Sequence, residues 1–308
     1  MFKDRIDRAE PTPARDALRM SRVLAATLML SMPLSMQPLQ AQTTSPQTSE
    51  SVHLADTGVL ALADAMQIKK IIAVMREEGL DYAKTLQEDM FPGAGNRGWI
   101  AEVEGIYDPD RMSREFEAAL SLALAGNPGL EAMTDFMGGV FGNRVIGLEL
   151  AARKALLDPA AEDAARVAWL KLEDEDGTRA QQIERFVAVN DLLDSNVTGA
   201  MNSNIAFYRG LMAAAPAGMD MTEDDILASV SDQQAQIEAD TADWLYPYLT
   251  LAYQPLTDAE LDDYVAFSES APGKDMNRAL FAAFAAMFDR LSYDLGVAAG
   301  RRMQGQDI

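Results

Sequence analysis

The chain contains no cysteine and a single histidine, and these two absences exclude several kinds of site. Without cysteine there is no disulfide, no thiolate metal site and no lipidated cysteine. A serine–histidine–aspartate or cysteine–histidine triad needs an imidazole base. The one histidine, His53, lies in a segment rich in Ser, Thr and Gln. We therefore expect neither a catalytic triad of this kind nor a zinc site.

Basic residues are scarce relative to acidic ones, which leaves a net charge of −22 on 308 residues. A surface of this sign repels nucleic acids and anionic lipid headgroups. Hydrophobic residues make up 48% of the chain, which is enough for a sizeable core. The composition predicts a folded acidic protein with no nucleic-acid partner.

The first 41 residues have the order of a secretory signal peptide. Basic residues precede an apolar run from Val23 to Met36, and the small residue Ala41 follows. The run is shorter than the roughly 20 residues that a membrane span needs. We expect cleavage after Ala41, no stable membrane anchor and a periplasmic or secreted product. A signal peptide that began with Met20-Ser21-Arg22 would have a more ordinary n-region than one that began at residue 1, so we predict that translation starts at Met20.

After the predicted cleavage site, residues 42–56 are rich in Ser, Thr, Gln and Pro, and we interpret them as a flexible linker. From residue 57 onward, apolar residues recur with the helical period, and hydrophobic–polar alternation is lacking. The pattern predicts an all-α, multi-helix fold. Helices are expected at about 57–78, 80–91, 97–106, 109–125, 128–139, 142–157, 159–173, 176–195, 197–214, 222–253, 257–269 and 273–302.

Two pairs of similar segments indicate an internal duplication. Residues 68–74 resemble residues 183–189, and residues 130–142 resemble residues 261–273 in the same order along the chain. We therefore predict two related helical repeats packed together. Their expected limits are 57–175 and 176–308.

Each copy of the second pair contains a phenylalanine followed six residues later by a glycine. These residues are Phe136 and Gly142 in the first copy and Phe267 and Gly273 in the second. We expect the phenylalanine to anchor the end of a helix in the core. We expect the glycine to allow either a positive φ or a close approach where the next helix begins.

The stretch from Tyr253 to Lys274 resembles the bacterial exported helical family catalogued as domain of unknown function 2059. That family has an aromatic residue, a Thr-x-x-Glu-Leu helix start and then Phe-Tyr-x-Ser-Pro-x-Gly-x-Lys. Ser268 stands at the tyrosine position and the proline is displaced to Pro272. The resemblance implies an all-α exported protein and supplies no activity or catalytic residue. The positions that match are Thr257, Glu260, Leu261, Phe267, Ser270, Gly273 and, one place early, Lys274.

Carboxylates are the remaining candidates for chemistry. The acidic turn Glu173–Gly177 would place Leu172 and Ile183 at the first and last ligand positions of an EF-hand loop, and neither can bind calcium. We interpret it as a polar turn and expect no metal. No phosphate loop or dinucleotide fingerprint is present, so no cofactor is expected.

Glu149 is the one weak catalytic candidate, because it lies in an apolar run four residues before Arg153. An i,i+4 ion pair between these residues would explain Glu149 structurally. A buried Glu149 with a shifted pKa would instead be a candidate general acid.

Three functions stay open on the sequence alone. The first, which the lack of catalytic motifs favours, is non-enzymatic binding of a partner protein or an apolar ligand. The second is a hydrolase of cell-wall or sugar substrates that uses two carboxylates. The third is a structural or envelope-stress protein without a ligand.

Overall fold

A computed structural model describes residues 57–91, 96–175, 177–216 and 221–305, with the side chains of residues 96 and 97 excepted. The predicted signal peptide, the linker and His53 lie outside these residues. All regular secondary structure in the described ranges is helical, which confirms the all-α prediction.

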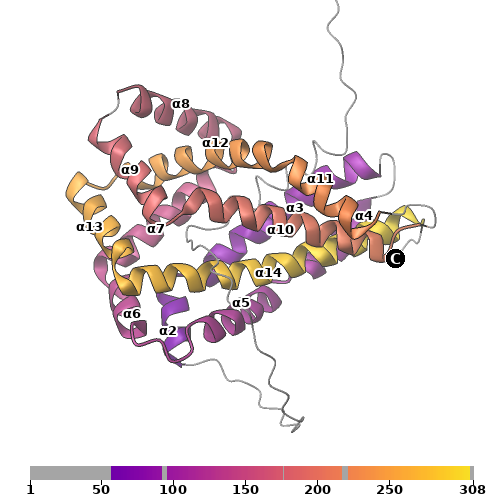
Figure 1. Cartoon of the computed structure of the whole chain (residues 1–308), viewed down its shortest axis with the longest axis horizontal. Coiled ribbons are helices and arrows are strands. Elements are labelled where there is room, and N and C mark those ends of the chain that lie inside the picture. Colours follow the sequence, from indigo (N-terminus) through magenta and orange to yellow (C-terminus); the bar gives the residue numbers. More distant parts are fainter. Residues whose placement is uncertain (1–56, 92–95, 176, 217–220, 306–308) are drawn as a thin grey trace, which may run out of the picture.

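The helices pack into one body around a continuous core (Figure 1). The first half of the chain contains α2 (Thr57–Ala65), α3 (Ile68–Met90), α4 (Asn96–Ile106), α5 (Pro109–Ala123), α6 (Leu130–Gly138), α7 (Val140–Ala155) and α8 (Pro159–Glu175). The second half contains α9 (Thr178–Val189), α10 (Leu192–Ala213), α11 (Glu223–Asp232), α12 (Gln234–Tyr253), α13 (Asp258–Glu269) and α14 (Ala271–Met303).

Several helix starts follow directly from capping residues. Asp108 accepts a hydrogen bond from the backbone N–H of Arg111 (2.8 Å) and precedes a proline at the first helical position of α5. Thr222 and Thr257 each form a reciprocal capping box with the acidic residue three places later, at the starts of α11 and α13. The polar sequence at these points therefore determines where the helices begin.

Three expected boundaries are wrong, and tertiary contacts explain one of them. The break expected at residue 196 lies instead at residues 190–191, between α9 and α10, where Asp191 has a φ of 48°. A break near Gly79 was expected, but Gly79 lies inside α3, and the chain turns earlier, at Gln67, which has a φ of 55°. A Cβ on Gly79 would overlap the ring of Tyr107, so this glycine makes room for a buried side chain. The single helix expected over 222–253 is divided at Gln233 into α11 and α12.

The two pairs of similar segments behave differently in the structure. Residues 68–74 begin α3, whereas residues 183–189 end α9, so this pair does not occupy equivalent positions. Residues 130–142 and 261–273 both span a helix end and the start of the next helix. The linking residues Gly139 and Ser270 have nearly the same backbone angles, with φ −67° and ψ 167° in the first and φ −68° and ψ 160° in the second.

The most extensive helix contact joins α10 and α14, which run parallel through the middle of the molecule (Figure 1). Gly210 of α10 faces the backbone of Tyr293, and Gly296 of α14 faces the backbone of Phe207. A Cβ at either glycine would overlap a backbone carbonyl oxygen of the other helix. These glycines therefore bring the two helix backbones into direct contact, and α14 also packs against α5, where the rings of Phe116 and Phe284 lie 4.3 Å apart.

None of the helices in the described ranges is both long enough and apolar enough to span a membrane.

Replacing Gly210 with alanine should lower the free energy of unfolding by about 1–3 kcal/mol, because the new methyl group meets backbone that cannot move without separating α10 from α14. Gly199→Ala is the matched control on the same helix, since a Cβ there meets no atom within 4 Å. It should be neutral or stabilising by up to about 1 kcal/mol. Urea denaturation of both variants checks this, and equal effects would contradict the direct contact.

Candidate functional site

Glu149 lies in the middle of α7, and its carboxyl group meets tyrosines from two helices of the other half of the chain. Tyr253 of α12 donates a hydrogen bond to Oε1 over 2.8 Å, and Tyr264 of α13 donates to the same oxygen over 3.2 Å. Tyr248 donates to the backbone carbonyl oxygen of Glu149 over 3.3 Å. All three tyrosines are buried, while Glu149 is half-buried. We call these four residues the Glu149 cluster.

Burial raises the pKa of Glu149 to about 7, and the hydrogen bonds from Tyr253 and Tyr264 oppose that rise. Burial also raises the pKa of each of the three tyrosines well above its ordinary value, with the Glu149 charge adding to the effect. The hydroxyls therefore stay protonated and donate, whereas Glu149 changes charge near neutral pH. The cluster can hold or release one proton between the two halves of the chain.

Arg153 was expected to pair with Glu149, but its guanidinium forms an ion pair with Glu78 of α3 instead. Nε and Nη2 of Arg153 lie 2.9 and 2.6 Å from the two carboxylate oxygens, and both side chains are buried. Burial acts to raise the pKa of Glu78, and the guanidinium acts to lower it. This two-point pair ties α7 to α3 within the first half, and the i,i+4 explanation of Glu149 is wrong.

The two similar segments that contain Phe136 and Phe267 lie against each other in the structure. The rings of Phe136 and Phe267 stack face to face, with centroids 3.7 Å apart and planes 1° apart. A Cβ on Gly142 would overlap the carbonyl oxygen of Phe136, and a Cβ on Gly273 would overlap that of Phe267. Close approach, rather than a positive φ, is therefore the reason for glycine at both places.

The remaining family-like positions have local structural roles. Glu260 completes the capping box of Thr257, and Leu261 is fully buried. Ser270 caps α14 by accepting from the backbone N–H of Gly273 over 3.1 Å. Lys274 is exposed on the first turn of that helix. None of these side chains lies with another in an arrangement suited to catalysis.

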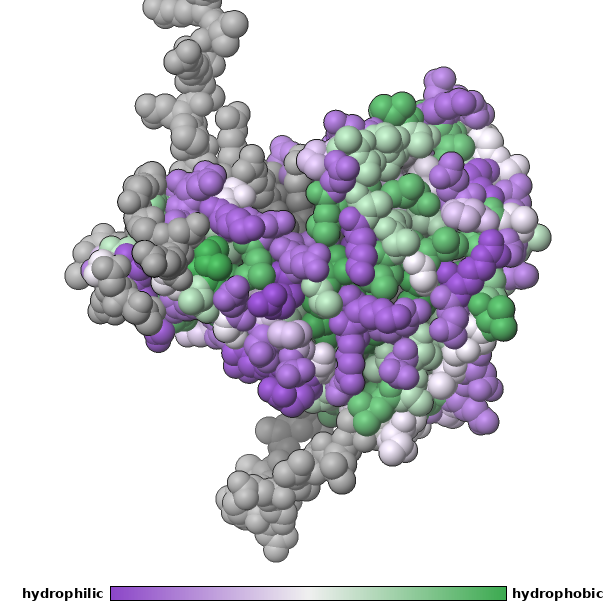
Figure 2. Space-filling model, turned by 180° about the vertical axis from the view of Figure 1, so that it is seen from behind, coloured by the Kyte–Doolittle hydropathy of each residue, from purple (hydrophilic) through white to green (hydrophobic). Residues whose placement is uncertain are grey.

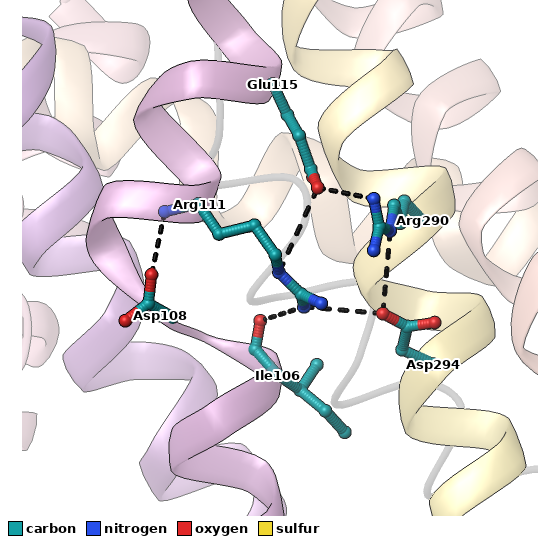
Figure 3. Close-up of polar contacts among 6 residues, drawn as sticks. All are labelled: Ile106, Asp108, Arg111, Glu115, Arg290 and Asp294. Carbon is teal, nitrogen blue, oxygen red and sulfur yellow. Dashed lines mark hydrogen bonds and ion pairs between the residues drawn. The ribbon is translucent and has the colours of Figure 1, made fainter.

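A second polar arrangement, shown in Figure 3, joins α5 to α14. Arg290 lies 2.6 Å from Glu115 and 3.6 Å from Asp294, and Arg111 lies 3.3 Å from Asp294 and 3.9 Å from Glu115. Two arginines thus alternate with two carboxylates. All four side chains are at least partly shielded from solvent, and the charges within the group balance.

An open groove runs beside this arrangement, between residues 202–209 of α10 and residues 286–294 of α14. Its volume is about 800 Å³. Its lining combines apolar side chains, such as Ile205 and Ala286, with arginine, aspartate and the half-exposed Tyr293. We call it the α10–α14 groove. Its volume falls in the range of sites for small ligands, which is roughly 300–1,000 Å³.

The exposed large hydrophobic side chains are spread over several helices. Leu122 lies at the end of α5, Val140 at the start of α7, and Val167 and Leu170 lie one turn apart on α8. On the face shown in Figure 2, hydrophobic residues are interrupted throughout by hydrophilic ones. The exposed large hydrophobic side chains named above therefore come from separate helices.

Among the described residues, no three His, Cys, Asp or Glu side chains gather closely enough to hold a metal ion. Comparisons of the chain with protein-family models, with curated proteins and with solved structures found no match. The resemblance to domain of unknown function 2059 stays a prediction.

Replacing Glu149 with glutamine tests the cluster through the pH dependence of stability. The folded protein binds this proton more tightly than the unfolded chain, because the pKa rises from 4.5 to about 7 on folding. The stability contribution of the proton is thus complete below pH 4.5 and is lost as pH rises through about 7. Glutamine keeps a neutral acceptor for both tyrosines and does not titrate. The free energy of unfolding of Glu149→Gln, relative to the parent, should therefore rise between pH 4.5 and pH 8 by at most about 3 kcal/mol.

Urea denaturation across this pH range provides the measurement. Glu131→Gln, a change of the same kind at an exposed position of α6, serves as the control and should run parallel to the parent. Parallel curves for Glu149→Gln and the parent would show that Glu149 titrates alike in the folded and unfolded states.

Proposed function

We propose that this is a non-enzymatic binding protein of the bacterial envelope that takes its ligand in the α10–α14 groove. The groove is the observation that carries the proposal, because it has the volume of a small-ligand site and combines polar and apolar groups. Its charged lining favours a polar or amphipathic ligand over the purely apolar ligand expected from the sequence.

The placement of the buried carboxylates also supports binding rather than catalysis. A two-carboxylate hydrolase needs both groups at one cleft, about 5–9.5 Å apart across the scissile bond. The carboxylate of Glu78 is held by Arg153, and that of Glu149 is held by Tyr253 and Tyr264. Neither residue lines the groove. The acids with the strongest interior contacts are thus used to join helices.

The second candidate is the carboxylate-dependent hydrolase, and one observation favours it. A carboxyl group with a pKa of about 7, such as that of Glu149, is suited to donate a proton near neutral pH. This function requires that Glu149→Gln abolish turnover of a cell-wall or sugar substrate. A variant with unchanged turnover would remove Glu149 from that role.

Export to the periplasm or full secretion is the second part of the proposal. It rests on the signal-peptide order of residues 1–41 and on the resemblance to domain of unknown function 2059, whose members are exported and helical. The all-α fold accords with that resemblance.

We further propose that α2–α7 and α9–α14 are two copies of one six-helix unit, with α8 as an added helix. Packing pairs recur in both sets: α2 contacts α6 as α9 contacts α13, and α3 contacts α4 as α10 contacts α11. In this arrangement α5 corresponds to α12, and α7 corresponds to α14. The contact of α5 with α14 is then equivalent to the contact of α12 with α7, as an approximate twofold axis between the two copies would require. Gln67 and Asp191, both left-handed, precede α3 and α10.

Filling the groove should abolish binding. Ala206 lines the groove on α10, and Ala206→Trp would occupy space that a ligand needs. Ala164→Trp, on an exposed position of α8, is the matched control. Envelope components that the parent retains in affinity purification should be retained by the control and lost by Ala206→Trp. If Ala206→Trp folds and retains every component, the groove is not the binding site.

Export can be tested separately by sequencing the N-terminus of the protein recovered from bacterial cells. Cleavage after Ala41 would leave Gln42 as the first residue. Recovery of the protein with residues before 42 still attached, together with a cytoplasmic location after fractionation, would contradict the export proposal and leave the binding proposal intact.

A further inference from the structure

The arginines of the α10–α14 groove are already paired with carboxylates, of which Asp294 belongs to the lining and Glu115 and Glu223 do not. Arg209 is held by Glu223 of α11, with Nε 3.0 Å from Oε1 and with Nη2 also donating to this oxygen. Arg290 is held by Glu115 and Asp294, as described above. A negatively charged ligand would therefore have to displace an existing partner from each guanidinium.

Asp289 stands apart from these pairs. It lies on α14 in the lining of the groove, and its Oδ1 is shielded from solvent without accepting a hydrogen bond from the described residues. Burial raises the pKa of Asp289, and the positive charge of Arg209 only partly opposes this rise. Partly burying a carboxylate is costly, and a positive charge held in the groove beside Asp289 would offset that cost.

The surroundings of Asp289 fit an alkyl chain that ends in a positive charge. Ala286 and Tyr293 line the groove from about one turn on either side of Asp289 along α14. Ile205 and Ala206 line it from α10. The aliphatic groups offer apolar contact, and the half-exposed tyrosine ring offers a face that attracts cations.

We propose that the α10–α14 groove binds an alkylammonium group, carried either by a free aliphatic amine or by a lysine side chain. The ammonium donates to Asp289, the methylene chain lies along Ile205 and Ala206, and the ring of Tyr293 flanks the charge. This inference rests on the proposed function, because it assigns a ligand class to the same groove. The protein's net charge of −22 draws such cations toward the surface in general, and Asp289 supplies the specific contact.

Calorimetric titration of the purified protein tests this with two probes. One is 1,5-diaminopentane, which represents a free amine, and the other is N-acetyl-lysine methylamide, which represents a lysine side chain. Saturable binding of at least one probe is expected, and the tighter probe identifies the source. Asp289→Asn should weaken that binding at least tenfold. Asp262→Asn removes the same charge from an exposed position of α13 and should change it less than twofold.

Tyr293→Leu keeps the carboxylate and should weaken binding severalfold, so the test does not depend on one variant. Absence of saturable binding for both probes, or equal weakening by Asp289→Asn and Asp262→Asn, overturns the inference. If the amines fail in this way while Ala206→Trp still loses an envelope component, only the ligand class is wrong. If Ala206→Trp loses nothing either, the groove itself is wrong.

Discussion

The direct backbone contact between α10 and α14 is the constraint on which the rest of the structure depends. It exists because Gly210 and Gly296 place no side chain between the two helices. The paired helices then present one side to the core, where α14 receives α5 and α10 receives α12. Residues that flank the contact on both helices also form the walls of the α10–α14 groove. The same contact thus fixes both the core and the proposed binding surface.

The Glu149 cluster forms a second connection, of a different kind, between the two halves of the chain. Its hydrogen bonds join α7 to α12 and α13, and the stacked rings of Phe136 and Phe267 lie between α6 and α13. Buried polar groups specify one arrangement of helices because a shifted arrangement would leave them unpaired. Together with the Glu78–Arg153 pair, the cluster gives Glu78 and Glu149 roles in joining helices.

Local patterns predicted the helices well, and contacts between distant residues explain what they missed. The helical period and caps such as Asp108 and Thr257 depend on neighbours along the chain, so the sequence displays them directly. Gly79 was misread as a helix break because its reason, the ring of Tyr107, lies elsewhere in the chain. The apolar run around Glu149 drew attention to this residue, but its hydrogen-bond partner Tyr253 lies 104 residues away in the chain and could not be identified from the sequence. Asp289 carried no sequence signal, because its partial burial and its place in the groove depend on residues of α10 that lie far away in the chain.

The central claim is that Asp289 is the partly buried carboxylate through which the groove recognises a cation. Carbon-13 NMR titration of the Asp289 carboxyl group, with and without 1,5-diaminopentane, measures this most directly. The account predicts a pKa above the ordinary 3.8 in the free protein and a clear fall when the amine is present. An ordinary pKa that the amine leaves unchanged would contradict it.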